Sequence, residues 1–198
     1  RPGIWHVQHI RSRGKLEVAQ FEQYEHLKVL ADQIEKDPTL ASALGEYSIS
    51  PDVVVFREPL SDEIINEPQN NVDDSVARLT PLREVNNKLM ILHACVSCKW
   101  TIRSDRSQVV RSEGASLLKN RKGQSPHICV TTAEPTPSRL SSIALGTGEI
   151  DCLYHIALPE LKAAIYETEN DEAINLVEMM IEGKRIRDIA DLPFDLVI

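Results

Sequence analysis

The sequence lacks any long hydrophobic run: no window approaches the roughly eighteen uninterrupted apolar residues that a membrane span requires. It also lacks the basic and then apolar N-terminus of a secretory signal. Four cysteines in 198 residues are too few for a disulfide framework. These absences argue against membrane-spanning and secreted proteins, and we expect an intracellular, cytoplasmic protein with reduced thiols.

A second pair of zinc ligands is also missing. Cys95 and Cys98 form a C-x-x-C motif, but a structural zinc site usually needs another pair of matching spacing, and Cys129 and Cys152 are single and far apart. We therefore do not expect zinc. A zinc-supported interaction domain that uses Cys95 and Cys98 stays open as an alternative.

An overall excess of positive charge, typical of nucleic-acid-binding proteins, is absent, because the net charge is −8. The distribution is nevertheless uneven. Seven basic and two acidic residues occur between Ser97 and Gly123, a local balance of +5. This strip either binds phosphates or forms the solvated face of a helix.

What the sequence does contain is an alternation of helical and strand patterns, in a chain whose length fits a single domain over residues 1–198. Short apolar runs predict strands over residues 52–56, 89–100, 127–132 and 152–156. Helical spacing predicts helices over residues 12–36, 105–120, from 138 onward, 159–167 and 171–183. Residues 57–88 form a polar excursion from the core. The alternation predicts an α/β fold with a mixed β-sheet flanked by α-helices.

Two residues at the end of the strand at 89–100 are suited to chemistry. Because side chains alternate along a strand, Ser97 and Lys99 point to the same face. A lysine at the end of a buried strand either reaches the solvent or meets a carboxylate or a phosphate. The sequence alone leaves both interpretations open.

Two carboxylates could join Lys99. Glu113 shares a helix face with apolar residues expected to pack on the sheet, namely Val109, Val110 and Leu117. Asp52 opens the first core strand and completes the set if the two strands are neighbours. Two carboxylates can hold Mg²⁺ with several of its waters, while a lysine orients the attacking water or helps to deprotonate it. We expect the centre to hydrolyse a phosphodiester.

The order of these residues resembles a known family. Pro51-Asp52, then 44 residues, Ser97-x-Lys99, then 13 residues and Glu113 is similar to the permuted active site of PD-(D/E)xK nucleases that cut sites with a CCGG core. The resemblance implies a restriction-endonuclease-like fold and a Mg²⁺-dependent type II site-specific deoxyribonuclease. It further implies that Asp52, Ser97, Lys99 and Glu113 are catalytic, with Asp52 and Glu113 as metal ligands.

The residues after the strand at 89–100 are suited to reading bases. Arg103-Ser104-Asp105-Arg106 enters the next helix, and arginine can donate two hydrogen bonds to guanine while aspartate can accept one from cytosine. By resemblance these four residues read the CCGG core. The alternative is that Asp105 caps the helix while the arginines contact phosphates. Arg139 is a weaker candidate for the outer base pair, because an arginine at a helix start is often only solvent-facing.

Further expectations come from the same resemblance. Residues 97–106 are most similar to a member that cuts GCCGGC on both strands. A palindrome implies two-fold related subunits, and the resemblance extends this to a homotetramer, a dimer of dimers on two DNA copies. Members carry an additional N-terminal region with one more acidic residue, so we expect the chain, which begins Arg1-Pro2-Gly3, to be truncated. The competing hypothesis is a sequence-specific DNA-binding module that does not cleave.

Overall fold

A computed structural model describes residues 3–10, 17–36, 51–67, 69–146 and 148–197. The chain divides into two compact units, which we describe separately. Unit 1 comprises Arg1–Ser50, Val54–His93 and Asn120–Pro126, and unit 2 comprises Pro51–Val53, Ala94–Lys119 and His127–Ile198. The assignment of residues 1–198 to a single domain stays a prediction.

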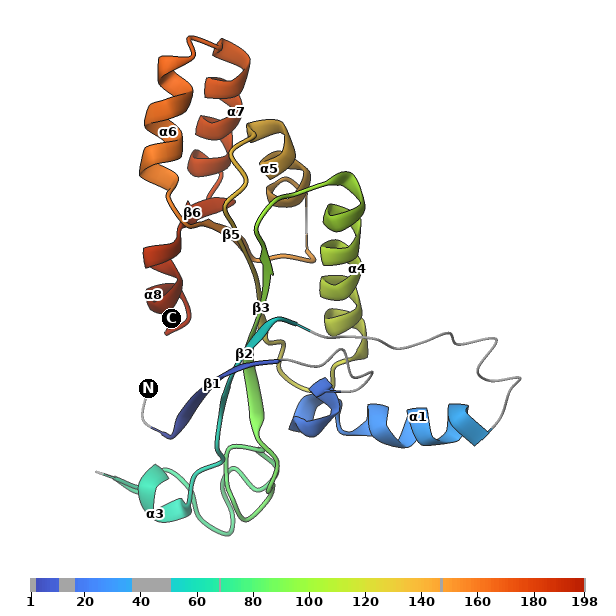
Figure 1. Cartoon of the computed structure of the whole chain (residues 1–198). Helices are drawn as coiled ribbons and strands as arrows, with labels where there is room; N and C mark the ends of the chain where they lie inside the picture. The colour runs from blue at the N-terminus through green and yellow to red at the C-terminus, as the bar shows by residue number, and fades with distance from the viewer. Residues whose placement is uncertain (1–2, 11–16, 37–50, 68, 147, 198) are drawn as a thin grey trace. The chain divides into compact units, whose positions relative to one another are not determined.

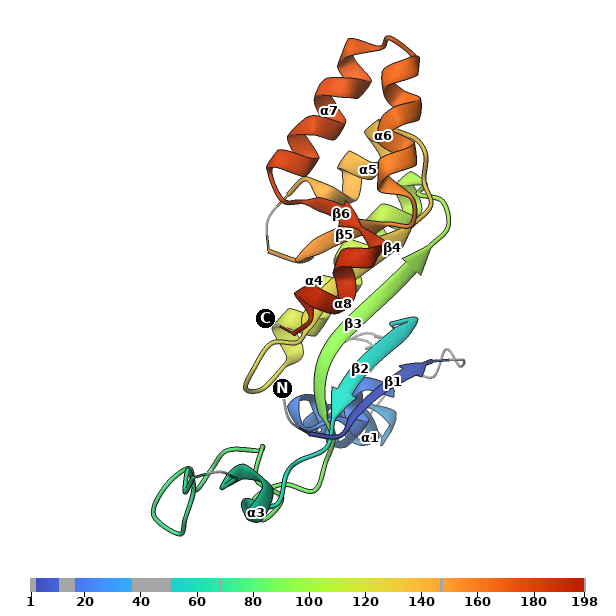
Figure 2. The ribbon, with the colours of Figure 1, turned by 90° about the vertical axis from the view of Figure 1, so that its left-hand side faces the viewer.

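Six strands form one sheet, and their order in space follows their order in the chain. Strands β3 to β6 are parallel to one another, whereas Figure 2 shows β2 running opposite to β3. The strands are β1 (Trp5–His9), β2 (Val53–Arg57), β3 (Ile91–Lys99), β4 (His127–Thr132), β5 (Cys152–His155) and β6 (Ile186–Asp188). A mixed sheet with flanking helices confirms the predicted α/β fold class.

The helices of unit 2 follow the predicted pattern closely. The helices that match a predicted one are α4 (Ser104–Asn120), which ends one residue beyond the unit, α5 (Pro137–Ala144), α6 (Leu158–Glu167) and α7 (Asp171–Glu182). The pattern predicted neither β6 nor the two short helices η3 (Ile189–Asp191) and α8 (Leu192–Asp195), and it also missed β1 in unit 1. Within the described ranges, no helix combines the length and the apolar character of a membrane span.

The continuous helix predicted over residues 12–36 is wrong in the part that the structure describes. The chain forms two 3-10 turns, η1 (Glu17–Gln20) and η2 (Glu22–Tyr24), before α1 (His26–Lys36) begins. Between the turns, the fully buried Phe21 is extended and forms a bridge to Met90. The tertiary bridge interrupts a pattern that is otherwise helical.

The excursion after β2 is ordered around a buried arginine in unit 1. It contains the short helix α3 (Asp62–Ile65). The guanidinium of Arg83, 4% exposed, donates to both carboxylate oxygens of Asp62 and to the carbonyls of Asp73 and Val76. A buried charge satisfied in this way helps to hold a polar loop together.

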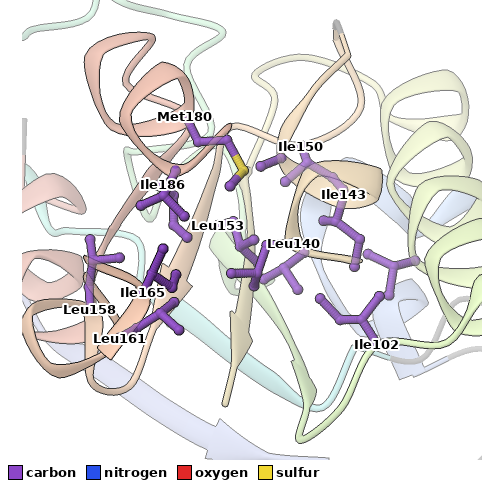
Figure 3. Close-up of a cluster of buried hydrophobic side chains, with 14 residues drawn as sticks. Ile102, Leu140, Ile143, Ile150, Leu153, Leu158, Leu161, Ile165, Met180 and Ile186 are labelled. Atoms are coloured by element: carbon purple, nitrogen blue, oxygen red, sulfur yellow. The ribbon is translucent and has the colours of Figure 1, made fainter. Parts of the chain in front are cut away.

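Unit 2 has a hydrophobic cluster on each face of its part of the sheet. The larger one joins Val130 and Leu153 of the sheet to side chains of α4, α5, α6 and α7 (Figure 3). The smaller joins Val96, Cys129, Cys152 and Tyr154 to residues of η3 and the C-terminal segment. Figure 1 shows α4 and α8 on opposite sides of these strands. Val96 of β3 lies in the smaller cluster, which sets the direction of its side chain and, by alternation, of its neighbours in unit 2.

Candidate active site

Asp52 and Lys99 form an ion pair in unit 2. Lys99 Nζ lies 3.1 Å from Asp52 Oδ2, and the same oxygen accepts a hydrogen bond of 2.7 Å from the backbone N–H of Cys98. The Lys99 side chain is 20% exposed and that of Asp52 is 39% exposed. The ion pair is therefore partly exposed to the solvent, and the Asp52 carboxylate keeps lone pairs that can accept further ligands.

Ser97 and Glu113 meet on the α4 face of the sheet. Because Val96 packs in the cluster on the opposite face, alternation turns Ser97 toward α4. There Ser97 Oγ lies 3.4 Å from Glu113 Oε2, a long and weak hydrogen bond. Alternation puts Lys99 on the same face as Ser97, as predicted.

The helix face that carries Glu113 differs slightly from the predicted one. Val110 and Leu117 are buried as expected, and the buried Gly114 continues this face, but Val109 is 51% exposed. The expectation that Val109 packs on the sheet is therefore wrong. Glu113 lies at the edge of the buried face, one residue from Gly114, which leaves its carboxylate half-buried rather than enclosed.

Glu113 has an electrostatically unfavourable position. Burial raises the pKa of Glu113 above its ordinary value of 4.5, and the negative charge of Asp52 raises it further, whereas Lys99 and the hydrogen bond from Ser97 lower it. The net shift is upward. Burial is the largest cause of this shift, and the charge of Lys99, which acts more strongly than that of Asp52, does not offset it.

This donor set fits a magnesium ion. Mg²⁺ prefers carboxylate oxygens, keeps several waters, and is commonly held by one or two carboxylates together with substrate phosphates. Asp52 and Glu113 provide two such groups. Among the described residues, no group of three or more His, Cys, Asp and Glu side chains could hold a metal. The pair would therefore leave most coordination positions to water and phosphate.

The predicted DNA-reading residues lie at the entrance of α4. Arg103, Asp105 and Arg106 are all exposed, and Arg106 Nη1 donates to the carbonyl of Thr101 at 3.2 Å. Ser104 begins α4, and its side chain is not among those described. Asp105 is the second residue of the helix rather than the residue before it. It therefore does not occupy the N-cap position that the alternative assigned to it.

Arg139 lies in the first turn of α5 and is held by a buried acid. Its Nη1 is 3.6 Å from Oε2 of Glu134, and its side chain is 55% exposed. Glu134, which was not among the predicted site residues, is 1% exposed. It follows β4 in the motif Ala133-Glu134-Pro135, where no periodic pattern marks it as buried.

The C-x-x-C motif does not form a chelating pair. Cys95 is buried and Cys98 is exposed. Because side chains alternate along a strand, two residues three positions apart point to opposite faces of the sheet. Burial raises the pKa of the Cys95 thiol well above its ordinary value, and it raises that of Cys129 to about 12. Thiols with such values hold their protons at neutral pH and are poor metal ligands.

Comparison with known proteins places the whole chain in one family. The family model described as "NgoMIV restriction enzyme" matches residues 1–198. The type II restriction enzyme NgoMIV of Neisseria gonorrhoeae is 52% identical over 199 residues, which cover all of this chain and 70% of that protein. Among solved structures, the Bse634I restriction endonuclease is similar at a TM-score of 0.44 and 14% identity, over 76% of this chain and 61% of that one. The resemblance predicted from the spacing of Asp52, Lys99 and Glu113 is confirmed: the chain belongs to the NgoMIV family of type II restriction endonucleases.

Proposed function

We propose that this chain carries the catalytic core of a Mg²⁺-dependent endonuclease that hydrolyses double-stranded DNA at a palindrome with a CCGG core, GCCGGC. The observation that carries the proposal is the convergence of Asp52, Lys99 and Glu113 where β3 ends and α4 faces it. Family membership supports the reaction class.

In this proposal each side chain has a distinct task. Asp52 and Glu113 would hold the cation, whose charge would offset both the burial of the Glu113 carboxylate and the repulsion from Asp52. When bound, Mg²⁺ polarises the phosphate and lowers the pKa of a coordinated water. Lys99, oriented by Asp52 at 3.1 Å, directs the attacking water and offsets the negative charge that develops on the phosphate. Ser97 holds Glu113 through its hydroxyl.

Recognition is assigned to the exposed side chains beside this centre. Arg103 and Arg106 would each donate two hydrogen bonds to guanine O6 and N7, and Asp105 would accept one from cytosine N4. Arg139 would contact the outer base pair. Ser104 stays in this group on the resemblance alone. Arg103, Asp105, Arg106 and Arg139 are exposed, which leaves their side chains accessible to a DNA major groove.

The assembly belongs to the same proposal. A palindromic site is read by two copies related by a two-fold axis, each with one active site and one set of reading residues. We extend this to a homotetramer, a dimer of dimers that binds two DNA copies. Light scattering after size-exclusion chromatography tests it, and a mass equal to one chain at micromolar concentration would contradict it.

A cleavage assay tests the function. The protein is incubated with a plasmid that carries one GCCGGC site, in Mg²⁺ or in EDTA, and the ends are mapped. We expect one linear product with ends inside the site, in Mg²⁺ only. Retention of the GCCGGC duplex in a gel shift without any cut would favour the non-cleaving DNA-binding module, which the basic strip around Arg103 also fits. Cleavage at random positions would contradict the assigned specificity.

A further inference from the structure

Glu134 is a charged side chain in unit 2 that the proposed chemistry does not use. It is 1% exposed and lies between β4 and α5. Burying a carboxylate without partners costs far more than most folds can tolerate, so its partners indicate its task.

The partners of Glu134 are backbone groups of two separate segments. Its Oε2 accepts a hydrogen bond of 2.8 Å from the backbone N–H of Ile102, and its Oε1 accepts one of 3.1 Å from the backbone N–H of Thr136. Its own backbone is also held: the N–H donates to Thr132 Oγ1 at 3.1 Å, and the carbonyl oxygen lies 3.1 Å from His155 Nε2. The carboxylate therefore fixes the distance between the segment before α4 and the segment before α5.

Both segments carry reading residues. Ile102 directly precedes Arg103, and its side chain is anchored at 1% exposure in the large cluster, where Figure 3 shows it near Ile143. A second tie runs from the backbone N–H of Ala133 to the carbonyl of Trp100 at 3.2 Å. The bonds from Glu134 and Ala133 therefore fix the backbone position from which the Arg103 side chain extends into the solvent.

The second segment is tied in the same way. Thr136 precedes α5, in which Arg139 follows within the first turn, and the Arg139 guanidinium lies 3.6 Å from Glu134 Oε2. One oxygen of Glu134 therefore contacts both the backbone before Arg103 and the guanidinium of Arg139.

We propose that Glu134 is a positioning residue for base discrimination, which holds Arg103 and Arg139 at a fixed spacing so that the inner and outer base pairs of the site are read together. The inference rests on the proposed function. A carboxylate suits this task because two acceptor oxygens face two N–H donors and a cation at once. An amide could satisfy only one of the two N–H groups.

The charge state agrees with the geometry. Burial alone would raise the pKa of Glu134, but the hydrogen bonds from Ile102 and Thr136 and the charge of Arg139 outweigh it, so the net shift is downward from the ordinary value of 4.5. The residue is ionised at neutral pH and acts as an acceptor for all three partners.

The test compares wild type with E134Q on duplexes in which one base pair of GCCGGC is replaced, at the inner or the outer position. Dissociation constants are measured without cleavage, in EDTA or Ca²⁺. We expect E134Q to reduce the discrimination against both replacements by on the order of tenfold, the size of one well-placed bidentate contact. Binding to an unrelated duplex should stay the same.

A double-mutant cycle separates positioning from general support. If Glu134 acts through Arg103, E134Q should add little to R103A at the inner base pair. The matched control is D188N, because the Asp188 carboxylate also accepts two backbone hydrogen bonds, from Leu158 and Ala190, but touches no reading segment. D188N should leave discrimination unchanged. Equal loss in D188N and E134Q, or full additivity with R103A, would overturn the inference.

Three further outcomes are informative. If E134Q melts below the assay temperature, E134D carries the same test, since it keeps both oxygens and the charge but is one methylene shorter. Unchanged discrimination in a folded variant would contradict the positioning role of Glu134 but not the proposed function. If wild type itself does not distinguish GCCGGC from the replaced duplexes, the proposed function fails, and the role of Glu134 fails with it.

Discussion

Glu113 and Glu134 are acids of the same compact unit with opposite surroundings. Glu113 is half-buried, with one long hydrogen bond from Ser97 and the opposing charges of Lys99 and Asp52 nearby, and burial raises its pKa. Glu134 is almost wholly buried, yet two backbone N–H groups and Arg139 satisfy it, and its pKa is lowered. Burial disfavours the charge in both cases, so the partners decide the direction of the shift.

On the proposed function, the difference separates a group that would bind a ligand from one that stabilises the fold. With its raised pKa, the Glu113 carboxylate costs folding free energy, which is typical of functional sites, and on the proposed function a bound cation would offset that cost. The Glu134 carboxylate contributes stability as it stands. Variants at the two positions should therefore change stability in opposite directions, whatever they do to activity.

The largest effect is expected on the chemical step. K99A removes the ammonium held by Asp52, and we expect cleavage of a GCCGGC plasmid to fall by about 10³-fold or more, as when one electrostatic stabiliser is lost. Gel shifts should show cognate binding largely retained. Circular dichroism serves as the folding control, and an unfolded K99A would place Lys99 in the structural framework instead.

The next largest effect is expected on recognition. On the proposed function, R103A and R106A would each remove a guanine contact, so cognate affinity should fall about tenfold to a hundredfold, or roughly 1–3 kcal/mol. Affinity for unrelated DNA should change little. An equal loss on both DNAs, together with a smaller salt dependence of binding, would assign the arginines to phosphates.

A smaller effect is expected on the pH dependence of stability. The pKa of Glu134 is lower in the folded protein than its ordinary 4.5, so its contribution is present above about pH 4.5 and is lost as the pH falls through the folded value. At neutral pH, E134Q should lose about 1–3 kcal/mol, the cost of a buried donor left unsatisfied. Thermal melts from pH 3.5 to 8 should show the gap to wild type closing toward low pH. A gap that is constant with pH would mean that packing, not charge, is what Glu134 supplies.

The smallest effect is expected at the cysteines. Because Cys98 is exposed and points away from the buried Cys95, C98S should leave Tm unchanged, and a zinc chelator should not alter the melt. Elemental analysis of the purified protein checks the same point. Stoichiometric zinc would revive the interpretation as a zinc-supported interaction domain.

The sequence predicted those parts of the fold that repeat a period. The strand at 127–132 matches β4, and the helix at 105–120 begins one residue early, at Ser104. The prediction of a continuous helix failed at Phe21, where a bridge to Met90 interrupts the helical spacing. No local pattern encodes a contact between residues so far apart in the chain.

The candidate site was predictable in part for the same reason. Helical spacing was enough to place Glu113 toward the sheet, and the resemblance linked it to Asp52 and Lys99. The role of Glu134 could not be predicted, because it depends on a hydrogen bond from the backbone N–H of Ile102. Every residue but proline has such a group, so the sequence does not indicate which one is used. An isolated glutamate before a proline otherwise looks like a surface loop residue.

The most direct test of the central claim is a pair of thermal melts of wild type and E113Q near pH 8, without and with Mg²⁺. The pKa of Glu113 is raised in the folded protein, so the charged form costs stability above that pKa, and the cost disappears below about pH 4.5. Without metal, E113Q should therefore melt at a higher temperature than wild type. Added Mg²⁺ should raise the Tm of wild type and not that of E113Q. A lower Tm for metal-free E113Q, or an equal response of both proteins to Mg²⁺, would contradict the account of Asp52 and Glu113 as a cation site.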